Sequence, residues 1–174
     1  MGMRGTKHRF MPNRLVFPGG AVDRADLDAP CASPLSPHTE HALRKSANAR
    51  LAHGIAIAAA RELAEETGLS LGEPPALDVL GYLARAVTPV GNPIRFNARF
   101  LVVPADAVAG ELTGGDGELD NLRYYGLSEA LALDLAAPTR RMLERLQVWL
   151  GMTEQEREAE AHTPVLRDRG WRME

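Results

Sequence analysis

The sequence contains a single cysteine, Cys31, among its 174 residues. One cysteine excludes an internal disulfide and a zinc site built from cysteine thiolates, and it fits a reducing compartment. The sequence also lacks a signal peptide and any run of about 18 apolar residues, the length that spans a membrane. We therefore expect a cytoplasmic protein that makes no membrane contact.

An excess of positive charge is missing as well. Twenty Lys and Arg residues stand against 23 Asp and Glu residues, which gives a net charge of −3. The chain as a whole therefore has no electrostatic reason to bind nucleic acid. The remaining composition is ordinary for a globular protein, with 45% hydrophobic and 25% charged residues. A chain of 174 residues is long enough for one well-buried domain and short for two.

Hydrophobic spacing predicts the main elements. Residues 94–103 alternate between apolar and polar side chains, the pattern of a strand with one buried face. Residues 138–150 place apolar side chains at helical spacing, with Pro138 in the first turn. The other predictions are strands at 14–17, at 77–87 and within 119–127, helices at 38–49, at 55–67 and from Ser128, and a charged tail at 153–174 that starts as a helix and ends loosely.

Three glutamates, Glu62, Glu65 and Glu66, recur at i, i+3 and i+4 in the helix predicted at 55–67. Side chains at this spacing are neighbours on one helix face, where like charges destabilise the helix. Small and apolar residues fall on the opposite side, so the helix can bury one face and present its carboxylates on the other. Such a stripe is usually solvated, but it is also a seat for hard divalent cations, which bind oxygen ligands. Gly68 is the expected C-cap.

A sharp turn, Pro18-Gly19-Gly20, follows the strand predicted at 14–17. Glycine leaves main-chain amides and carbonyls open to a ligand, so this turn is a candidate half of a binding site. The segment from 21 to about 53 then changes character, with several prolines and aspartates, and is predicted to be a long excursion.

These residues together resemble the Nudix box, G-x5-E-x7-R-E-U-x-E-E-x-G-U, in which U is a bulky apolar residue. Arg61-Glu62-Leu63-Ala64-Glu65-Glu66-Thr67-Gly68-Leu69 matches every fixed position of its second half. The first half is expanded: Gly20 and Arg61 are 41 positions apart, 27 more than in the pattern, which places an insertion at about 21–53. The early glutamate of the box has two candidate counterparts, Asp26 counted forward from Gly20 and His53 counted back from Arg61.

An upstream pattern that ends in F-P-G-G resembles a branch of this family that includes coenzyme A diphosphatases. Arg4, Arg9 and Phe17-Pro18-Gly19-Gly20 stand at the spacing of that pattern, while Gly5 and Asn13 depart from it.

The resemblance implies an α/β fold, the Nudix fold, in which a mixed sheet is sandwiched between helices (α/β/α). It implies one domain at 1–152 that carries the insertion, followed by the charged tail at 153–174. The implied activity is hydrolysis of the diphosphate bond in a nucleoside diphosphate linked to another moiety. The implied cofactor is Mg²⁺ or Mn²⁺, and the implied partner is a small-molecule nucleotide, coenzyme A or a related compound.

Each residue of the box has an expected role. Glu62 and Glu66 are the first-choice metal ligands, with Glu65 sharing a second ion. A main-chain carbonyl of Gly19 or Gly20 would complete the shell. Arg61, four residues before Glu65, is expected to pair with the carboxylates and orient them. We count Arg61 and Glu65 among the catalytic residues.

Outside the box, Glu118 is the candidate general base, because a Gly-rich loop that leads into a strand can bring it towards the metals. Asp120 and Glu111 are its rivals. The candidate substrate contacts are arginines, each weighed against the alternative of a solvated surface charge: Arg4, Arg9, Arg95 and Arg99.

Two other functions remain open. One is a Nudix fold that binds a nucleotide as a sensor with little catalysis, which the intact glutamates disfavour. The other is an RNA 5′-end pyrophosphohydrolase, which the negative net charge disfavours. A homodimer is a further hypothesis, suggested by an exposed helix that carries Trp149 and by an incomplete first strand at the start of the chain.

Overall fold

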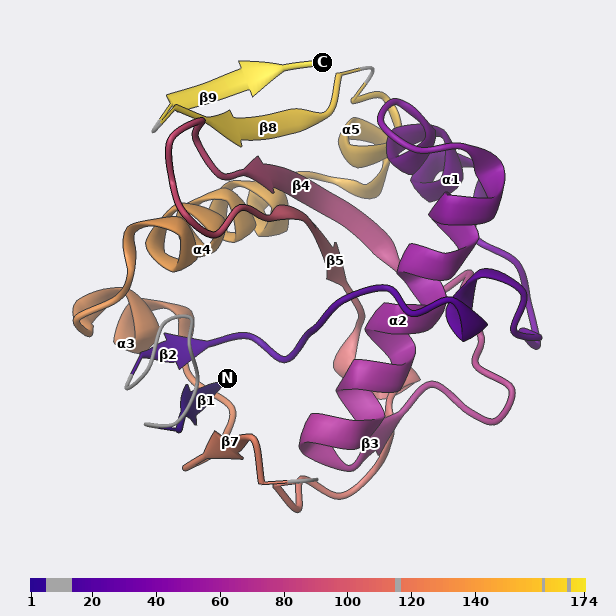
Figure 1. Ribbon diagram of the computed structural model, residues 1–174, viewed down its shortest axis with the longest axis horizontal. Coiled ribbons are helices and arrows are strands. Elements are labelled where there is room, and N and C mark those ends of the chain that lie inside the picture. The colour runs from indigo at the N-terminus through magenta and orange to yellow at the C-terminus, as the bar shows by residue number, and fades with distance from the viewer. Residues whose placement is uncertain (6–13, 115–116, 161, 169) are drawn as a thin grey trace.

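The computed structural model describes residues 1–5, 14–114, 117–160, 162–168 and 170–174 (Figure 1). Its helices are α1 (Pro37–Arg44), α2 (Ala49–Thr67), α3 (Leu127–Ala132), α4 (Ala137–Gly151) and α5 (Glu154–Glu158), with 3₁₀ turns η1 (Ala25–Leu27) and η2 (Ala105–Ala107). Its strands are β1 (Gly2–Arg4), β2 (Leu15–Val16), β3 (Leu69–Ser70), β4 (Gly81–Val87), β5 (Asn97–Val102), β6 (Ala109–Gly110), β7 (Leu119–Asp120), β8 (Pro164–Arg167) and β9 (Gly170–Met173).

The central element is a four-stranded mixed sheet in the order β5-β4-β8-β9. Strand β4 pairs antiparallel with β5 and parallel with β8. Helices α1 and α2 cover one face, where Leu43 and Ile55 pack with Tyr82. Helix α4 covers the other face, where Met142 packs with Leu83. The expected α/β architecture, a mixed sheet with helices on both faces, is confirmed (Figure 1).

The C-terminal residues are part of this sheet. After α5, which confirms the predicted helical start of the tail, β8 pairs with β4 and β9 pairs with β8. Val165 of β8 has no exposed surface, and Leu166 packs with Met142 and Ala84. The prediction that the tail ends loosely is therefore wrong, and the packed unit extends beyond residue 152. Three buried residues in a row, Pro164–Leu166, are too few for a periodic pattern to show.

The insertion adds to the core. It contains α1, which confirms the helix predicted in this region, although α1 ends at Arg44 and not at residue 49. The Ser36 side chain caps the first turn of α1. Helix α2 begins at Ala49, six residues before its predicted start, because the Asn48 side chain accepts a hydrogen bond from Leu51 N at 2.9 Å and caps it. The Thr39 hydroxyl donates to the Leu80 carbonyl at 2.7 Å, which fixes α1 to the start of the sheet.

Two strands are shorter than predicted: β4 starts at Gly81 and not at 77, and β5 starts at Asn97 and not at 94. Residues 77–80 form a turn before β4, and Leu77 and Leu80 are buried against α2 rather than along a sheet. Strand β5 starts at Asn97, and Ile94 and Phe96 before it are exposed. At 77–80 the leucines are buried but the backbone is not extended, and at 94–96 the apolar residues are not buried. The apolar pattern alone therefore does not fix the bounds of a strand.

Two smaller sheets accompany the central one: β3 pairs with β6, and a three-stranded sheet has the order β2-β1-β7. In β1, Met3 pairs with Leu15 of β2 and Arg4 pairs with Leu119 of β7. Strand β2 leads into the Pro18-Gly19-Gly20 turn, and β7 begins directly after Glu118. The three-stranded sheet thus brings together two segments that are about a hundred residues apart in the chain. No helix in the described part of the chain is both long and apolar enough to cross a membrane.

Candidate active site

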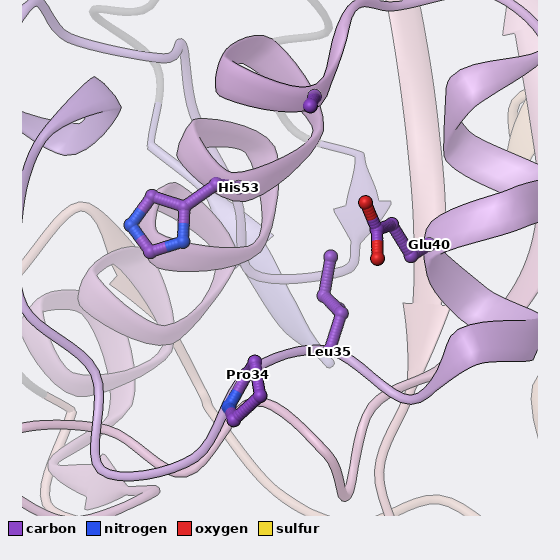
Figure 2. A pocket seen from close by; sticks show the side chains of 5 residues that line it. Pro34, Leu35, Glu40 and His53 are labelled. Carbon is purple, nitrogen blue, oxygen red and sulfur yellow. The ribbon is translucent and has the colours of Figure 1, made fainter.

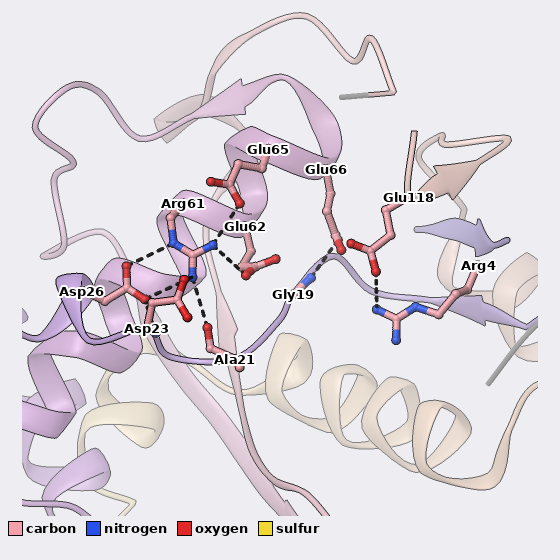
Figure 3. Close-up of polar contacts among 10 residues, drawn as sticks. All are labelled: Arg4, Gly19, Ala21, Asp23, Asp26, Arg61, Glu62, Glu65, Glu66 and Glu118. Carbon is pink, nitrogen blue, oxygen red and sulfur yellow. Dashed lines mark hydrogen bonds and ion pairs between the residues drawn. The ribbon is translucent and has the colours of Figure 1, made fainter. Parts of the chain in front are cut away.

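Glu66 is the most deeply buried carboxylate at the C-terminal end of α2, with 1% of its surface exposed. Its Oε2 accepts a hydrogen bond from Gly19 N at 2.9 Å (Figure 3). Its Oε1 is buried and has no hydrogen-bond partner among the described residues. Burial, together with the nearby charges of Glu118 and Glu62, raises the pKa of Glu66 to about 7 against the opposing effect of the Gly19 N–H and of Arg4.

Gly20 allows the turn to lie directly on Glu62. A Cβ at position 20 would come within 2.5 Å of Glu62 Cδ, so only a hydrogen fits there. Gly19 beside it has a φ of +148°, a backbone conformation that favours glycine. The structure therefore brings the Pro18-Gly19-Gly20 turn against the glutamate face of α2.

Arg61 donates hydrogen bonds to three carboxylates, those of Glu62, Glu65 and Asp26. One of its nitrogens, Nη1, donates to Glu62 Oε1 at 2.8 Å and to Glu65 Oε2 at 2.9 Å. On its other side, Nε and Nη2 each donate to a carboxylate oxygen of Asp26 at 3.1 Å, and Nη2 also donates to the Ala21 carbonyl at 3.1 Å. Arg61 is thus surrounded by acceptors in Figure 3, and no substrate contact is needed to explain its position.

Asp26, one of the two candidate counterparts of the early glutamate, pairs with Arg61 in the structure. It lies in η1, is 3% exposed, and forms a fork with Arg61 that lowers the pKa of its carboxyl group. His53, the rival, instead places Nε2 at 2.8 Å from the Ala29 carbonyl. Asp26, the candidate found by counting forward from Gly20, is therefore the residue that pairs with Arg61. The 27 residues by which the motif is expanded lie between Asp26 and Arg61 in the chain.

Glu118 approaches Glu66 from the other direction. Figure 3 shows its carboxylate beside Glu66, with a dashed line joining it to Arg4. Arg4 Nη2 lies 3.8 Å from Glu118 Oε1, and Arg4 is only 17% exposed in its side chain. The rivals Asp120 and Glu111 are both exposed.

The remaining arginines are not gathered into this site. Arg9 lies outside the described residues. Arg95 is exposed and donates to the Thr88 carbonyl, and Arg99 is half-buried and donates to Ser46. Their predicted role as substrate contacts gains no support from these partners.

The insertion forms a separate pocket, shown in Figure 2. It lies between α1, the segment before α1 and the first turns of α2, and it is lined by Pro34, Leu35, Glu40, Ala49 and His53. None of these residues belongs to the carboxylate site.

The donor set fits a hard divalent cation. Glu66 Oε1 is a buried carboxylate oxygen with no partner in the part of the chain that the structure describes, and Glu62 lies against the Gly20 main chain. However, no three His, Cys, Asp or Glu side chains of the described residues converge into a ready-made cage. The reason is that Glu62 and Glu65 are both turned onto Arg61. A cation here would need Glu62 to turn, or would take further oxygens from main chain, water or substrate.

A comparison with protein families identifies the motif. A family model described as the NUDIX domain matches residues 53–146, more than half of the chain. The chain belongs to the Nudix family. The match begins in α2 and leaves out the Pro18-Gly19-Gly20 turn and Asp26. The structure places both beside the Nudix helix.

Two similar proteins carry the same family name. "Putative nudix hydrolase 7" of Caenorhabditis elegans is 39% identical over 66 residues, which cover 38% of this chain and 15% of that protein. The crystal structure of a NUDIX hydrolase from Alicyclobacillus acidocaldarius superimposes with a TM-score of 0.60 at 23% identity, covering 82% of this chain and 80% of that one. At this identity the second likeness shows a shared Nudix fold.

Proposed function

We propose that this protein is a divalent-metal-dependent hydrolase that cleaves the diphosphate bond of a nucleoside diphosphate linked to another moiety. The observation that carries the proposal is Glu66, a buried carboxylate with one oxygen bound to Gly19 N and the other without a partner among the described residues. A carboxylate is rarely buried in this way unless a cation or a proton completes it. Membership of the Nudix family supports the same reaction class.

Mg²⁺ or Mn²⁺ at this position would neutralise the phosphate oxygens and lower the pKa of an attacking water. Glu66 and Glu62 would hold the ion, Glu65 would reach a second one, and a carbonyl of Gly19 or Gly20 would add a neutral oxygen. Arg61 is a positioning residue, because its five acceptors hold the glutamates and the η1 segment in one arrangement.

Glu118 would take the proton from the attacking water. Its carboxylate faces Glu66, and it is half-exposed, so water can reach it. Arg4, at 3.8 Å, restrains this side chain and partly offsets the negative charge around Glu66. Arg4 can also meet a phosphate of the substrate, because its buried Nε has no partner among the described residues.

The substrate proposed first is coenzyme A or a related nucleotide. The support is the upstream pattern, in which Arg4 and Phe17-Pro18-Gly19-Gly20 stand at the expected spacing. In the structure Arg4 lies in β1, and Phe17-Pro18-Gly19-Gly20 directly follows the neighbouring strand β2. Gly19 N contacts Glu66, and Arg4 lies 3.8 Å from Glu118.

The test is a substrate panel with Mg²⁺ and with Mn²⁺. Coenzyme A, ADP-ribose, NADH, diadenosine polyphosphates, nucleoside triphosphates and 5′-triphosphorylated RNA are assayed side by side for release of phosphate or nucleotide. The variants are Glu66→Gln and Glu65→Gln, and Glu158→Gln, on the exposed last residue of α5, is the matched control.

We expect the wild type and Glu158→Gln to hydrolyse the same nucleotide diphosphate, and Glu66→Gln to lose activity by about a hundredfold or more. Tight nucleotide binding without turnover would establish a sensor instead. Turnover of RNA alone would establish the RNA enzyme. A mass measurement in solution tests the separate proposal of a homodimer.

A further inference from the structure

Three arginines project from one face of the four-stranded sheet. Arg85 of β4 lies directly opposite Arg99 of β5, and Arg167 of β8 pairs with Val87, two residues beyond Arg85 on β4. Residues two apart in a strand share a face, so these side chains stand on the same side. We call Arg85, Arg99 and Arg167 the arginine face. It continues the side of the sheet on which Leu101 packs against α2.

Most partners of these arginines in the described part of the chain are neutral: Arg85 donates to the Asn97 side chain at 2.7 Å, and Arg99 donates to the Asn97 carbonyl and to Ser46. Like charges placed opposite each other in a sheet destabilise it. Burial and the charge of Arg85 both lower the pKa of Arg99. In the described structure, Glu174 is the one carboxylate at ion-pair distance: Oε2 lies 2.8 Å from Arg85 Nη1 and Oε1 lies 3.7 Å from Arg167 Nη2. Lys45 adds a fourth cation, with Nζ 3.3 Å from the Glu174 main-chain oxygen.

Unpaired buried polar atoms mark the same place. The described residues contain four such side-chain atoms, and each needs an explanation in a folded protein. Two of them, Arg4 Nε and Glu66 Oε1, belong to the candidate active site. The other two are Arg99 Nε and Arg167 Nε, on the arginine face. The feature that supports a ligand at the active site thus recurs at this second place.

We propose that the arginine face is a second anion-binding site, which accepts the phosphate group of a small phosphorylated ligand and which the Glu174 carboxylate fills as an internal substitute. Guanidinium groups bind phosphate through paired N–H donors, and a phosphate dianion brings twice the charge of one carboxylate. The entry side is open, since the side chains of Arg167 and Glu174 are 40% and 34% exposed. Arg85, at 12%, forms the inner wall.

The experiment is a titration of the full chain with inorganic phosphate in the presence of EDTA, followed by NMR shifts or by calorimetry. EDTA keeps the proposed metal chemistry out of the measurement. The variants are Arg85→Gln, Arg167→Gln and Glu174→Gln. The matched control is Arg141→Gln on α4, an exposed arginine paired with Glu144.

Arg85→Gln and Arg167→Gln should each weaken phosphate binding by about tenfold, and Glu174→Gln should tighten it by about threefold or more, because the internal competitor is removed. Arg141→Gln should bind as the wild type does. Thermal unfolding identifies any variant that fails to fold; if Arg85→Gln does, Arg167→Gln carries the test.

Equal binding by all variants, or weaker binding by Glu174→Gln, would overturn the proposal and leave the Glu174 contacts as structural ion pairs. Hydrolysis of a diphosphate substrate by the wild type is unaffected by either result, so this test stands apart from that of the proposed function.

Discussion

At the scale of single residues, the candidate site depends on how closely the chain approaches itself. Gly20 has no side chain, and the Glu62 carboxylate fills the space that a Cβ would take. Replacement by any other residue must therefore move either the turn or the glutamate.

Gly20→Ala should reduce kcat/KM for the substrate identified by the panel by about 10- to 100-fold, because it displaces a proposed metal ligand. Gly151→Ala is the control, since nothing lies within 4 Å of a Cβ built there. Activity measured with both variants checks the prediction, and a fully active Gly20→Ala enzyme would contradict the role given to Glu62.

Glu66 gives a second prediction, for the metal-free protein. Its folded pKa of about 7 is above the ordinary value of 4.5. The stability that it contributes is therefore fully present below pH 4.5 and lost as the pH rises through about 7. Glu66→Gln stays neutral, so with EDTA at about pH 8 it should be more stable than the wild type by up to about 3 kcal/mol, with little difference at about pH 5.

Chemical denaturation of both proteins at the two pH values measures this effect. A variant that is less stable than the wild type at the higher pH would show that the buried carboxylate is already compensated without a metal.

At the scale of elements, the η1 turn and α2 are joined by the fork between Asp26 and Arg61. Asp26 is 3% exposed, whereas Asp28 in the same segment has an exposed side chain and pairs with Arg50 on the surface. The first pair should therefore contribute to stability and the second very little.

Asp26→Asn should destabilise the protein by about 1–3 kcal/mol near neutral pH, and Asp28→Asn should leave its stability nearly unchanged. Because pairing lowers the pKa of Asp26, its contribution is present above 3.8, the ordinary value, and is lost as the pH falls through the folded pKa. Urea unfolding curves near neutral pH and in acid measure both statements. Equal effects of the two variants would show that the fork adds no stability.

At the scale of the whole molecule, the C-terminal strands β8 and β9 complete the four-stranded sheet. Val165→Ala in β8 should cost about 2 kcal/mol, because the side chain has no exposed surface. Met173→Ala in β9 is the control, since Met173 is 55% exposed and should change stability by about 0.5 kcal/mol or less. Thermal unfolding of the two variants compares them. If Val165→Ala left the unfolding temperature unchanged, the C-terminal strands would contribute little to the stability of the sheet.

The sequence by itself determined the features that depend on local order. The spacing of Glu62, Glu65 and Glu66 on one helix face, with Arg61 before them and Gly68 after, follows from the helical repeat alone. The Pro18-Gly19-Gly20 turn is likewise local, because glycine permits it whatever surrounds it.

Only the tertiary structure decided which distant residues complete these local features. In the fold Asp26, and not His53, pairs with Arg61, which lies 35 residues further along the chain. Strand β8 pairs with β4, some eighty residues earlier. The fold also sets Arg85, Arg99 and Arg167 on one face. Strand pairing and burial at such separations depend on the packing of the whole chain, and no local periodicity records them.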